Sequence, residues 1–292
     1  MAFRSIEHLL SCSGAGPLWQ ALIESDCEDR GVTFQQSWDQ MARLWQAMGE
    51  AVADYDPLRR SPSGLTGGAA DLVGGEGGLV AEQGGGLCGP FFSAVIATAL
   101  KTGECNACMR RIVAAPTAGA SGVLPAVLLP LKARDGHSDE EMVRALFVAA
   151  GFGQVIASRA SISGAEGGCQ AEVGSASGMA AAALVALKGG TSEQMAQACA
   201  LALGNILGLV CDPVAGLVEV PCVSRNVMGA VNALSCAEMA LCGVSTPIPC
   251  DEVIDAMRAV GDAMPAALRE TGTGGLAATT TGQRIAQSLG RD

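Results

Sequence analysis

The chain of 292 residues is long enough to bury a sizeable hydrophobic core in one large domain or two small ones. Its net charge of −11 argues against binding to nucleic acid or to anionic membranes, because such surfaces need a positive footprint. Hydrophobic residues make up 49% of the chain and aromatic residues only 3%, so the apolar mass is mainly aliphatic. This mixture favours packed helices over a β-sandwich.

No stretch of the sequence predicts a membrane span. The two most apolar stretches, 87–100 and 195–210, are interrupted by polar or helix-breaking residues. Neither reaches the roughly 18 uninterrupted apolar residues that a spanning helix needs. An acidic residue, Glu7, lies where a signal peptide would be apolar. We therefore expect a soluble, cytoplasmic protein without membrane or nucleic-acid partners.

The pattern of apolar residues predicts two helices in residues 1–60. Pro17 suits the start of the first helix, and Gly31 suits the position just after its end. The second carries an apolar stripe at helical spacing, which is more typical of a core or subunit interface than of a cofactor site: Trp38, Met41, Trp45, Met48 and Val52. We expect residues 1–60 to pack on the same domain as a catalytic core formed by residues 61–292.

A glycine-rich segment, residues 61–90, follows these helices and has two possible interpretations. Eleven glycines lie between Gly64 and Gly89, which is typical of a flexible linker. The segment contains no Lys or Arg, however, and an apolar helix-like run, 91–100, comes directly after it. An ordered loop in which the backbone approaches a ligand closely explains these features equally well.

Helices recur through the rest of the chain, and no strand series or fixed-period repeat interrupts them. Capping residues, apolar spacing and helix breakers define four: one capped at Ser138, one capped at Thr191 or Ser192, one from about Asn226 to Cys242, and one from Asp251 to just before Pro265. The predicted fold is therefore all-α, in a single domain. Three segments rich in Gly, Ser and Thr are predicted to be functional loops: Pro116–Gly122, Ser161–Gly178 and Asp212–Glu219.

The twelve cysteines are the most informative feature of the composition, because in a reducing compartment they are thiols, metal ligands or catalysts rather than disulfides. Eight are expected to be buried small hydrophobes: Cys12, Cys27, Cys88, Cys105, Cys108, Cys199, Cys236 and Cys242. Three lie beside Gly or Pro at the ends of predicted helices, where free N–H groups can bond thiolates: Cys169, Cys211 and Cys222. Their spacing matches no zinc finger and no ferredoxin run, so spacing alone is weak evidence for a metal site.

The segments around these three cysteines resemble the signature of iron–sulfur-dependent L-serine dehydratases. The two long segments are ASISGAEGGCQAEVGSASGM (160–179) and GLVCDPVAGLVEVPCVSRN (208–226). Shorter matches cover nearly the whole chain: SGLTGG (63–68), PTAGASG (116–122) and LRETGTGGLA (268–277). The resemblance implies an all-helical domain in which Cys169, Cys211 and Cys222 ligate a [4Fe–4S] cluster.

Three cysteine ligands instead of the usual four leave one iron with an open position, which is what Lewis-acid catalysis requires. L-Serine offers that iron a carboxylate and a β-hydroxyl, and loss of hydroxide and of the Cα proton gives aminoacrylate, which becomes pyruvate and ammonia in water. The resemblance implies that Gly-rich loops surround the open iron. The side chains expected to bind the substrate are Ser63, Thr66, Thr117, Ser121, Ser163 and Arg225.

Structural roles remain open for all of these side chains, since hydroxyls often stabilise turns and an arginine often serves an internal ion pair. Four carboxylates flank the cysteines, and we expect structural or supporting roles for them: Glu166, Glu172, Asp212 and Glu219.

The general base is missing from this inventory. The two histidines, His8 and His137, lie outside the matching segments. Relatives fuse to, or associate with, a β domain that is thought to supply a histidine, so we expect a separate β subunit to complete the site and the α chain to be inactive alone. No cysteine follows Gly282, so we do not expect the cluster to be capped by a terminal cysteine as in some single-chain relatives.

Three alternative functions stay open at this point. An L-cysteine desulfidase would use a similar domain and chemistry but would expel sulfide instead of hydroxide. A non-catalytic helical scaffold would use its cysteines as buried hydrophobes. A zinc-binding module would hold one metal ion in place of a cluster.

Overall fold

The computed structural model describes residues 3–12, 16–75 and 86–291, and within them every regular element is a helix. This confirms the prediction of an all-α fold. The helices are α1 (Ile6–Ser11), α2 (Leu18–Arg30), α3 (Phe34–Ala53), α4 (Ala69–Gly74), α6 (Gly89–Ala107), α7 (Val123–Asp135), α8 (Asp139–Arg159), α9 (Gly164–Gly167), α10 (Ser175–Leu187), α11 (Ser192–Gly204), α12 (Cys222–Leu241), α13 (Cys250–Ala263) and α14 (Thr280–Ser288). Between them lie a π-helix and short 3-10 turns: η1 (Gln170–Gly174), η2 (Val214–Gly216), η3 (Ala266–Leu268) and η4 (Gly275–Ala278).

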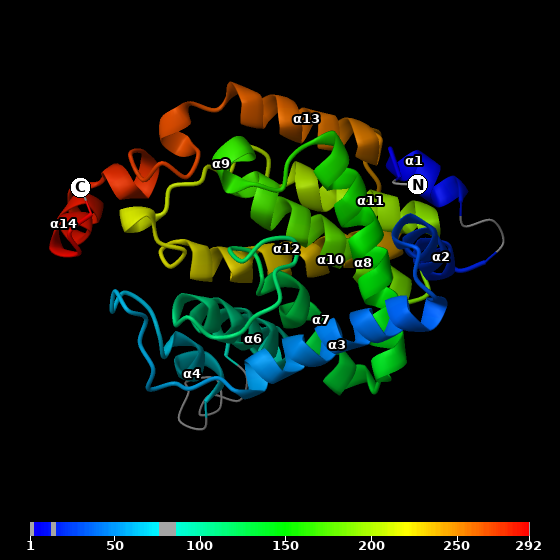
Figure 1. The fold of residues 1–292 in the computed structure, drawn as a ribbon, viewed down its shortest axis with the longest axis horizontal. Helices are drawn as coiled ribbons and strands as arrows, with labels where there is room; N and C mark the ends of the chain where they lie inside the picture. The colour runs from blue at the N-terminus through cyan, green and yellow to red at the C-terminus, as the bar shows by residue number, and fades with distance from the viewer. Residues whose placement is uncertain (1–2, 13–15, 76–85, 292) are drawn as a thin grey trace.

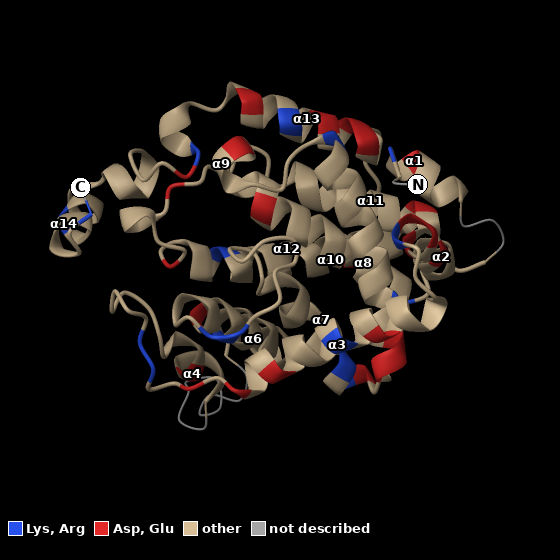
Figure 2. Ribbon diagram, in the orientation of Figure 1, with Lys and Arg blue, Asp and Glu red and all other residues tan. Residues whose placement is uncertain are grey.

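The core is built around α10, an alanine-rich helix without a charged residue. Helices α7, α8, α11 and α12 all pack against α10, which lies in the middle of the bundle, with α13 along one side and α3 along the other (Figure 1). Figure 2 shows acidic and basic residues on the outer helices α3 and α13, whereas the ribbon of α10 is free of both. Small side chains on α10 let its neighbours approach closely, which explains how a chain with few aromatic residues reaches a close-packed interior.

Several predicted helices are confirmed together with their caps. Gly31 ends α2 in the left-handed conformation, as expected for a residue without a Cβ. Ser138 and Thr191 each form a capping box, at the start of α8 and of α11. Helix α3 carries the predicted stripe, with Trp45 buried and the ring of Trp38 packed between those of Trp19 and Phe147.

Other predicted helix and loop boundaries were wrong. The region before residue 60 contains three described helices instead of two, and α12 begins at Cys222, four residues before the predicted start. The segment 161–178, predicted to be a loop, is largely helical, because α9, η1 and the start of α10 occupy it. Its small residues are required by packing: a Cβ at Gly178 would lie 2.9 Å from the Sγ of Cys199 on α11. Tertiary packing here overrides the low helix propensity of Gly and Ser.

The expectation that eight cysteines are buried hydrophobes was wrong for three of them. Cys12, Cys88 and Cys242 are exposed. Each is a helix-capping residue, at the end of α1, the start of α6 and the end of α12 respectively. Cap residues lie where a helix reaches the surface, so local position outweighs the usual preference of cysteine for the interior. Cys27 is half-buried, and the buried ones are Cys105, Cys108, Cys199 and Cys236.

The glycine-rich segment is ordered where it is described, from residue 61 to 75; residues 76–85 lie outside the described part of the chain. The Ser61 N–H donates to the Thr66 carbonyl at 2.9 Å, which closes a turn. The N–H groups of Ala69 and Ala70 donate to the carboxylate of Glu104, which is buried on α6 and also accepts a hydrogen bond from the Tyr55 hydroxyl at 2.6 Å. These contacts favour the ordered-loop interpretation over the linker.

Among the described helices, α8 alone has the length and composition of a membrane span, and 61% of that stretch is buried inside the fold. Such burial is typical of a core helix. The two marked termini lie at opposite ends of the molecule in Figure 1. The domain boundary drawn at residue 60 stays a prediction, and α2 and α3 both pack on α8.

Candidate metal centre

The three cysteines singled out from the sequence come from three separate segments of the fold. Cys169 directly precedes η1, and Cys222 is the first residue of α12. Cys211 lies in the extended segment after α11, where it forms an isolated parallel bridge with Arg269. All three are buried, with 2%, 2% and 7% of their surface exposed for Cys169, Cys211 and Cys222.

The main chain around these residues is held from several sides. Cys211 donates its N–H to the carbonyl of Leu268 and accepts from the N–H of Glu270, both at 2.8 Å. The buried side chain of Gln170 donates to a carbonyl of α13 at 2.9 Å and accepts from the N–H of Gly208, also at 2.9 Å. The turn that carries Cys169 is therefore fixed both to the strand-like segment of Cys211 and to α13.

Two of the three thiols converge with a carboxylate in a space lined by glycine, and Cys222 is not part of this group. The Sγ atoms of Cys169 and Cys211 and a carboxylate oxygen of Glu172 all lie within 4.8 Å of one another. A Cβ at Gly164 would lie 2.7 Å from Glu172 Oε2 and 3.0 Å from Cys211 Sγ, and one at Gly119 would lie 3.1 Å from Glu172 Oε1. Glycine at these two positions therefore keeps the space beside the thiols and the carboxylate open.

Arg225 makes three contacts around this space. Its Nη1 donates to the Sγ of Cys169 at 3.3 Å and to the carbonyl of Val210 at 2.8 Å, and its Nη2 donates to Asp212 at 2.7 Å. Both members of the Arg225–Asp212 ion pair are largely buried. Asp212 also accepts from the N–H of Leu276 at 2.7 Å. Arg225, predicted to bind the substrate, thus already donates hydrogen bonds to Cys169 and Asp212.

The ionisation of these groups is strongly interdependent. A hydrogen bond from Cys211, assisted by nearby Arg225, lowers the pKa of Cys169. The same hydrogen bond, together with burial, raises the pKa of Cys211. Burial raises the pKa of Cys222 to about 12 and also raises the pKa of Glu172. Nearby positive charge favours the ionised form of such groups, as Arg225 does for Cys169.

Asn226, one turn after Cys222 on α12, is a positioning residue that the sequence analysis did not single out. Its Nδ2 donates to the carbonyls of Gly119 and Cys222 at 2.8 and 2.9 Å, and its Oδ1 accepts from the N–H of Gly122 at 2.8 Å. It therefore fixes the loop 116–122 against the start of α12. Two features of the sequence could have indicated this residue: it belongs to the segment 208–226, and it lies on an apolar face of the predicted helix.

Ser63 is linked to the start of α12 by a hydrogen bond to the carboxylate of Glu219. Its hydroxyl donates to Glu219 at 2.8 Å, and the Ser61 hydroxyl donates to the same carboxylate at 2.6 Å. Glu219 is buried and lies three residues before Cys222. A cavity of about 550 Å³ is lined by Ser63, Ala118 and residues 216–219 among others. The predicted loops thus meet at one cavity beside the start of α12.

The other hydroxyls predicted to bind substrate lie in different surroundings. Thr117 donates to Glu172 at 2.8 Å. The Ser121 hydroxyl is buried and has no hydrogen-bond partner among the described atoms. Ser163 is the N-cap residue of α9 and makes no side-chain cap bond there, while Thr66 closes its turn through main-chain atoms. Of these hydroxyls, that of Thr117 is linked through Glu172 to the group of thiols.

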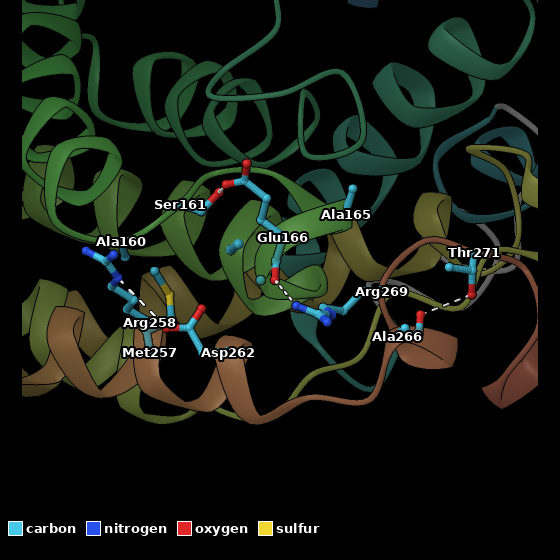
Figure 3. A pocket seen from close by; sticks show the side chains of 12 residues that line it. Ala160, Ser161, Ala165, Glu166, Met257, Arg258, Asp262, Ala266, Arg269 and Thr271 are labelled. Atoms are coloured by element: carbon cyan, nitrogen blue, oxygen red, sulfur yellow. Dashed lines mark hydrogen bonds and ion pairs between the residues drawn. The ribbon is translucent and has the colours of Figure 1, made fainter.

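A second cavity, of about 440 Å³, lies on the other side of the Cys169 turn and is lined by Glu166, Arg258 and Arg269 among others. Figure 3 shows the Glu166 side chain turned toward Ser161, whose hydroxyl donates to it at 2.6 Å. None of the three cysteines lines this cavity. None of them lines the cavity beside Ser63 either, so neither cavity is lined by a predicted ligand.

Both histidines belong to other parts of the fold. His8 lies on α1, with its ring 5.8 Å from that of Phe3. His137 precedes α8 and contacts Glu141 at 3.2 Å. Each histidine thus contacts residues at the helix start nearest to it. The source of the base at the cysteine site stays a prediction.

Comparisons with known proteins place these features in a family context. Residues 15–277 match the family described as "Serine dehydratase alpha chain". The chain is 48% identical over 289 residues to "Probable L-serine dehydratase, alpha chain" of Bacillus subtilis (strain 168), a match that covers 98% of this chain and 95% of that protein. It is 54% identical over 198 residues to the protein of the same name in Latilactobacillus sakei, covering 68% and 95%. It is 50% identical over 205 residues to "L-serine dehydratase, alpha chain" of Peptoniphilus asaccharolyticus, covering 70% of each.

Proposed function

Because the chain belongs to the serine dehydratase alpha chain family, we propose that it is the catalytic α subunit of an iron–sulfur L-serine dehydratase in the cytoplasm. The reaction removes water from L-serine to give aminoacrylate, which hydrolyses to pyruvate and ammonia. The relatives are named as alpha chains of this enzyme, and that naming supports both the substrate and a second kind of subunit.

The observation that carries the proposal is the convergence of thiols from distant segments in a glycine-lined space. Cys169 and Cys211 lie together with Glu172 within 4.8 Å, while Cys222, at the buried start of α12, lies outside that group. Buried thiols gathered beside an arginine suit an anionic iron–sulfur cluster, which is held by cysteine thiolates and tuned by hydrogen bonds to sulfur. Cys169, Cys211 and Cys222 would be its ligands.

When bound through three cysteines, such a cluster would supply one iron with an open position for Lewis-acid chemistry. The chain's own residues would orient the ligands and the substrate. Arg225 holds Cys169 through a charge-assisted hydrogen bond and is itself fixed by Asp212. Asn226 holds the loop of Thr117 and Ser121 against α12.

The hydroxyl of Ser121 supports a binding role for that loop. A buried hydroxyl without a partner costs free energy, so in a functional protein it usually meets a ligand or ordered water. A substrate carboxylate is an acceptor of the right kind. Ser63, Thr66, Thr117 and Ser163 are the further hydroxyls that we propose for substrate binding.

We propose that the general base comes from a separate β subunit, because both histidines of this chain lie away from the cysteines. The α chain then binds the cluster and the substrate carboxylate, and the partner removes the Cα proton. Assaying the anaerobically purified α chain with and without its partner tests this division. Full activity of the α chain alone would contradict it.

Three measurements on anaerobically prepared protein test the main proposal. Iron and acid-labile sulfide should be present in equal amounts, and the protein should be brown with broad visible absorbance. In the presence of the partner, pyruvate should form from L-serine faster than from L-cysteine. A colourless protein without iron would refute the proposal, zinc in its place would indicate a zinc module, and sulfide release from cysteine would indicate a desulfidase.

A further inference from the structure

Four carboxylates flank the proposed cluster ligands, and three of them are already engaged elsewhere. Glu166 accepts from the Ser161 hydroxyl, Asp212 pairs with Arg225, and Glu219 accepts from the hydroxyls of the 61–63 turn. Glu172 differs from these three, because its carboxylate joins the thiols of Cys169 and Cys211 within 4.8 Å. It is thus the flanking carboxylate that faces the metal centre.

The backbone that presents Glu172 is unusual. Glu172 is the middle residue of η1, a π-helix that continues directly into α10. A π-helical turn contains an extra residue, which changes the direction of the side chains it carries, and such turns occur often at functional sites. The turn is fixed on both sides: Gln170 bonds to a carbonyl of α13, and a Cβ at Gly229 on α12 would lie only 2.7 Å from a methyl carbon of Val173.

The space around the carboxylate is also specific. Thr117 donates to Oε1 at 2.8 Å, and it is the one hydrogen-bond partner that the described residues give this carboxylate. Gly119 and Gly164 approach the two oxygens so closely that any side chain there would collide with them. One oxygen is thus anchored to Thr117, while the other lies beside Gly164 and receives no hydrogen bond from the described residues.

We propose that Glu172 is the fourth ligand of the cluster when substrate is absent: Oε2 binds the iron that lacks a cysteine, while Oε1 stays on Thr117. A carboxylate oxygen is a suitable ligand for iron in proteins. When the substrate binds, Glu172 would leave the open position, and Thr117 would keep its carboxylate beside the site. This inference rests on the proposed function, because it requires the cluster on Cys169, Cys211 and Cys222.

The main test compares Glu172→Gln with Glu166→Gln in anaerobically purified protein enriched in ⁵⁷Fe. Glu166 is a matched control, since it lies six residues earlier in the same segment but its carboxylate is bound to Ser161. We expect both variants to retain iron and sulfide. In Glu172→Gln the Mössbauer signal of the unique iron should change, and the visible absorbance should be lost in air about tenfold faster, a typical effect of altering a metal's surroundings. Glu166→Gln should match the wild type in both measurements.

A second variant separates ligation from support of the fold. Glu172→Ala leaves space for a small anion, so added formate should restore the wild-type rate of bleaching in air and the Mössbauer signal of the unique iron. Circular dichroism should show unchanged helical content. A carboxylate that only stabilised the Thr117 loop would give no such rescue at the iron.

The outcomes separate the two proposals. A wild-type protein without iron and sulfide would overturn the proposed function itself. A wild-type protein with a cluster whose Mössbauer signal and bleaching rate are the same in Glu172→Gln would overturn only the role of Glu172. Loss of all iron from Glu172→Gln would also overturn it, because a ligand that the substrate displaces cannot be needed to retain the cluster.

Discussion

Two groups of cysteines in this chain are equally buried, yet their surroundings differ. Cys169 and Cys211 of the metal centre each expose 2% of their surface, and Cys199 and Cys236 of the helical core expose none. The core pair lies inside α11 and α12 in the packed bundle, where Cys236 also contacts the side chains of Asn205 and Asn232. The site pair lies in irregular segments between helices, beside the charged side chain of Arg225.

The difference shows that burial alone does not identify a metal ligand. Burial raises the pKa of Cys236, although a hydrogen bond from Asn205 acts in the opposite direction. The pKa of Cys169 is lowered instead, by its hydrogen bond from Cys211 and by nearby Arg225. What distinguishes the candidate metal centre is therefore the combination of converging acidic groups, a buried cation and glycines that keep the space open.

The largest expected effect comes from replacing one cysteine of each group. Cys211→Ala should lose the cluster and lower serine dehydratase activity by roughly a thousandfold or more, because Lewis-acid activation contributes several kcal/mol. Cys236→Ala should retain iron and activity and lose about 1 kcal/mol of stability, as for a typical core truncation. Iron quantitation, pyruvate formation and urea unfolding measure these effects. Equal loss of iron in both variants would abolish the distinction between the groups.

The next prediction compares how much a buried ion pair of the candidate metal centre and an exposed ion pair contribute to the free energy of unfolding. Asp212→Ala leaves Arg225 buried and unpaired, which should reduce the free energy of unfolding by about 3–5 kcal/mol. Glu50→Ala breaks a solvent-exposed pair with Arg111 and should cost at most about 1 kcal/mol. Urea denaturation of the two variants compares them directly. Similar losses would mean that Asp212 is not the anchor of Arg225.

The helical part of this comparison was largely predictable from sequence, because its signals are local. Capping boxes at Ser138 and Thr191 and the breaker Gly31 act within a few residues, and all three helix ends appear where expected. The prediction of a loop at 161–178 was wrong because the structure there depends on packing with distant helices. Its small residues allow tight helix packing, and composition alone cannot distinguish this from a loop.

The metal centre was predictable only as a set of residues. The resemblance of its segments pointed to the three cysteines, but their contacts join positions far apart in the chain. Gln170 bonds to α13, and Asn226 bonds across to Gly119, more than a hundred residues away. The direction of Glu172 depends on a π-helical turn that no periodicity in the sequence indicated. Such long-range contacts follow from the packed fold alone.

A smaller effect should follow from adding one methyl group in each region. Gly164→Ala places a Cβ 2.7 Å from Glu172 and 3.0 Å from Cys211 Sγ, so it should cost about 1–3 kcal/mol by overpacking and reduce iron content. Gly204→Ala, at the end of α11, meets nothing within 4 Å and should gain about 0.5 kcal/mol. Thermal unfolding and iron quantitation measure both. Normal iron content in Gly164→Ala would contradict the assigned role of this glycine.

The smallest expected effect concerns the pH dependence of stability that the capping box of α8 gives to the helical core, away from the candidate metal centre. Hydrogen bonds from Ser138, and then one from His137, lower the pKa of Glu141 to about 2. In the unfolded chain a glutamate titrates near 4.3, so the folded state holds this proton less tightly. The capping contribution is then complete above about pH 4.3 and is lost as the pH falls toward 2. Glu141→Gln should therefore weaken the pH dependence of unfolding in this window, as measured by melting temperature.

Glu140→Gln is the matched control for this prediction, because Glu140 lies in the same turn but contacts only Arg144, at 3.5 Å, in an exposed pair. It should leave the pH dependence close to that of the wild type, since exposed pairs contribute little. Both variants should retain normal iron at neutral pH, because α8 supplies none of the proposed cluster ligands. If Glu141→Gln and Glu140→Gln changed the acid transition equally, the effect would come from net charge, and the capping box of α8 would not be its cause.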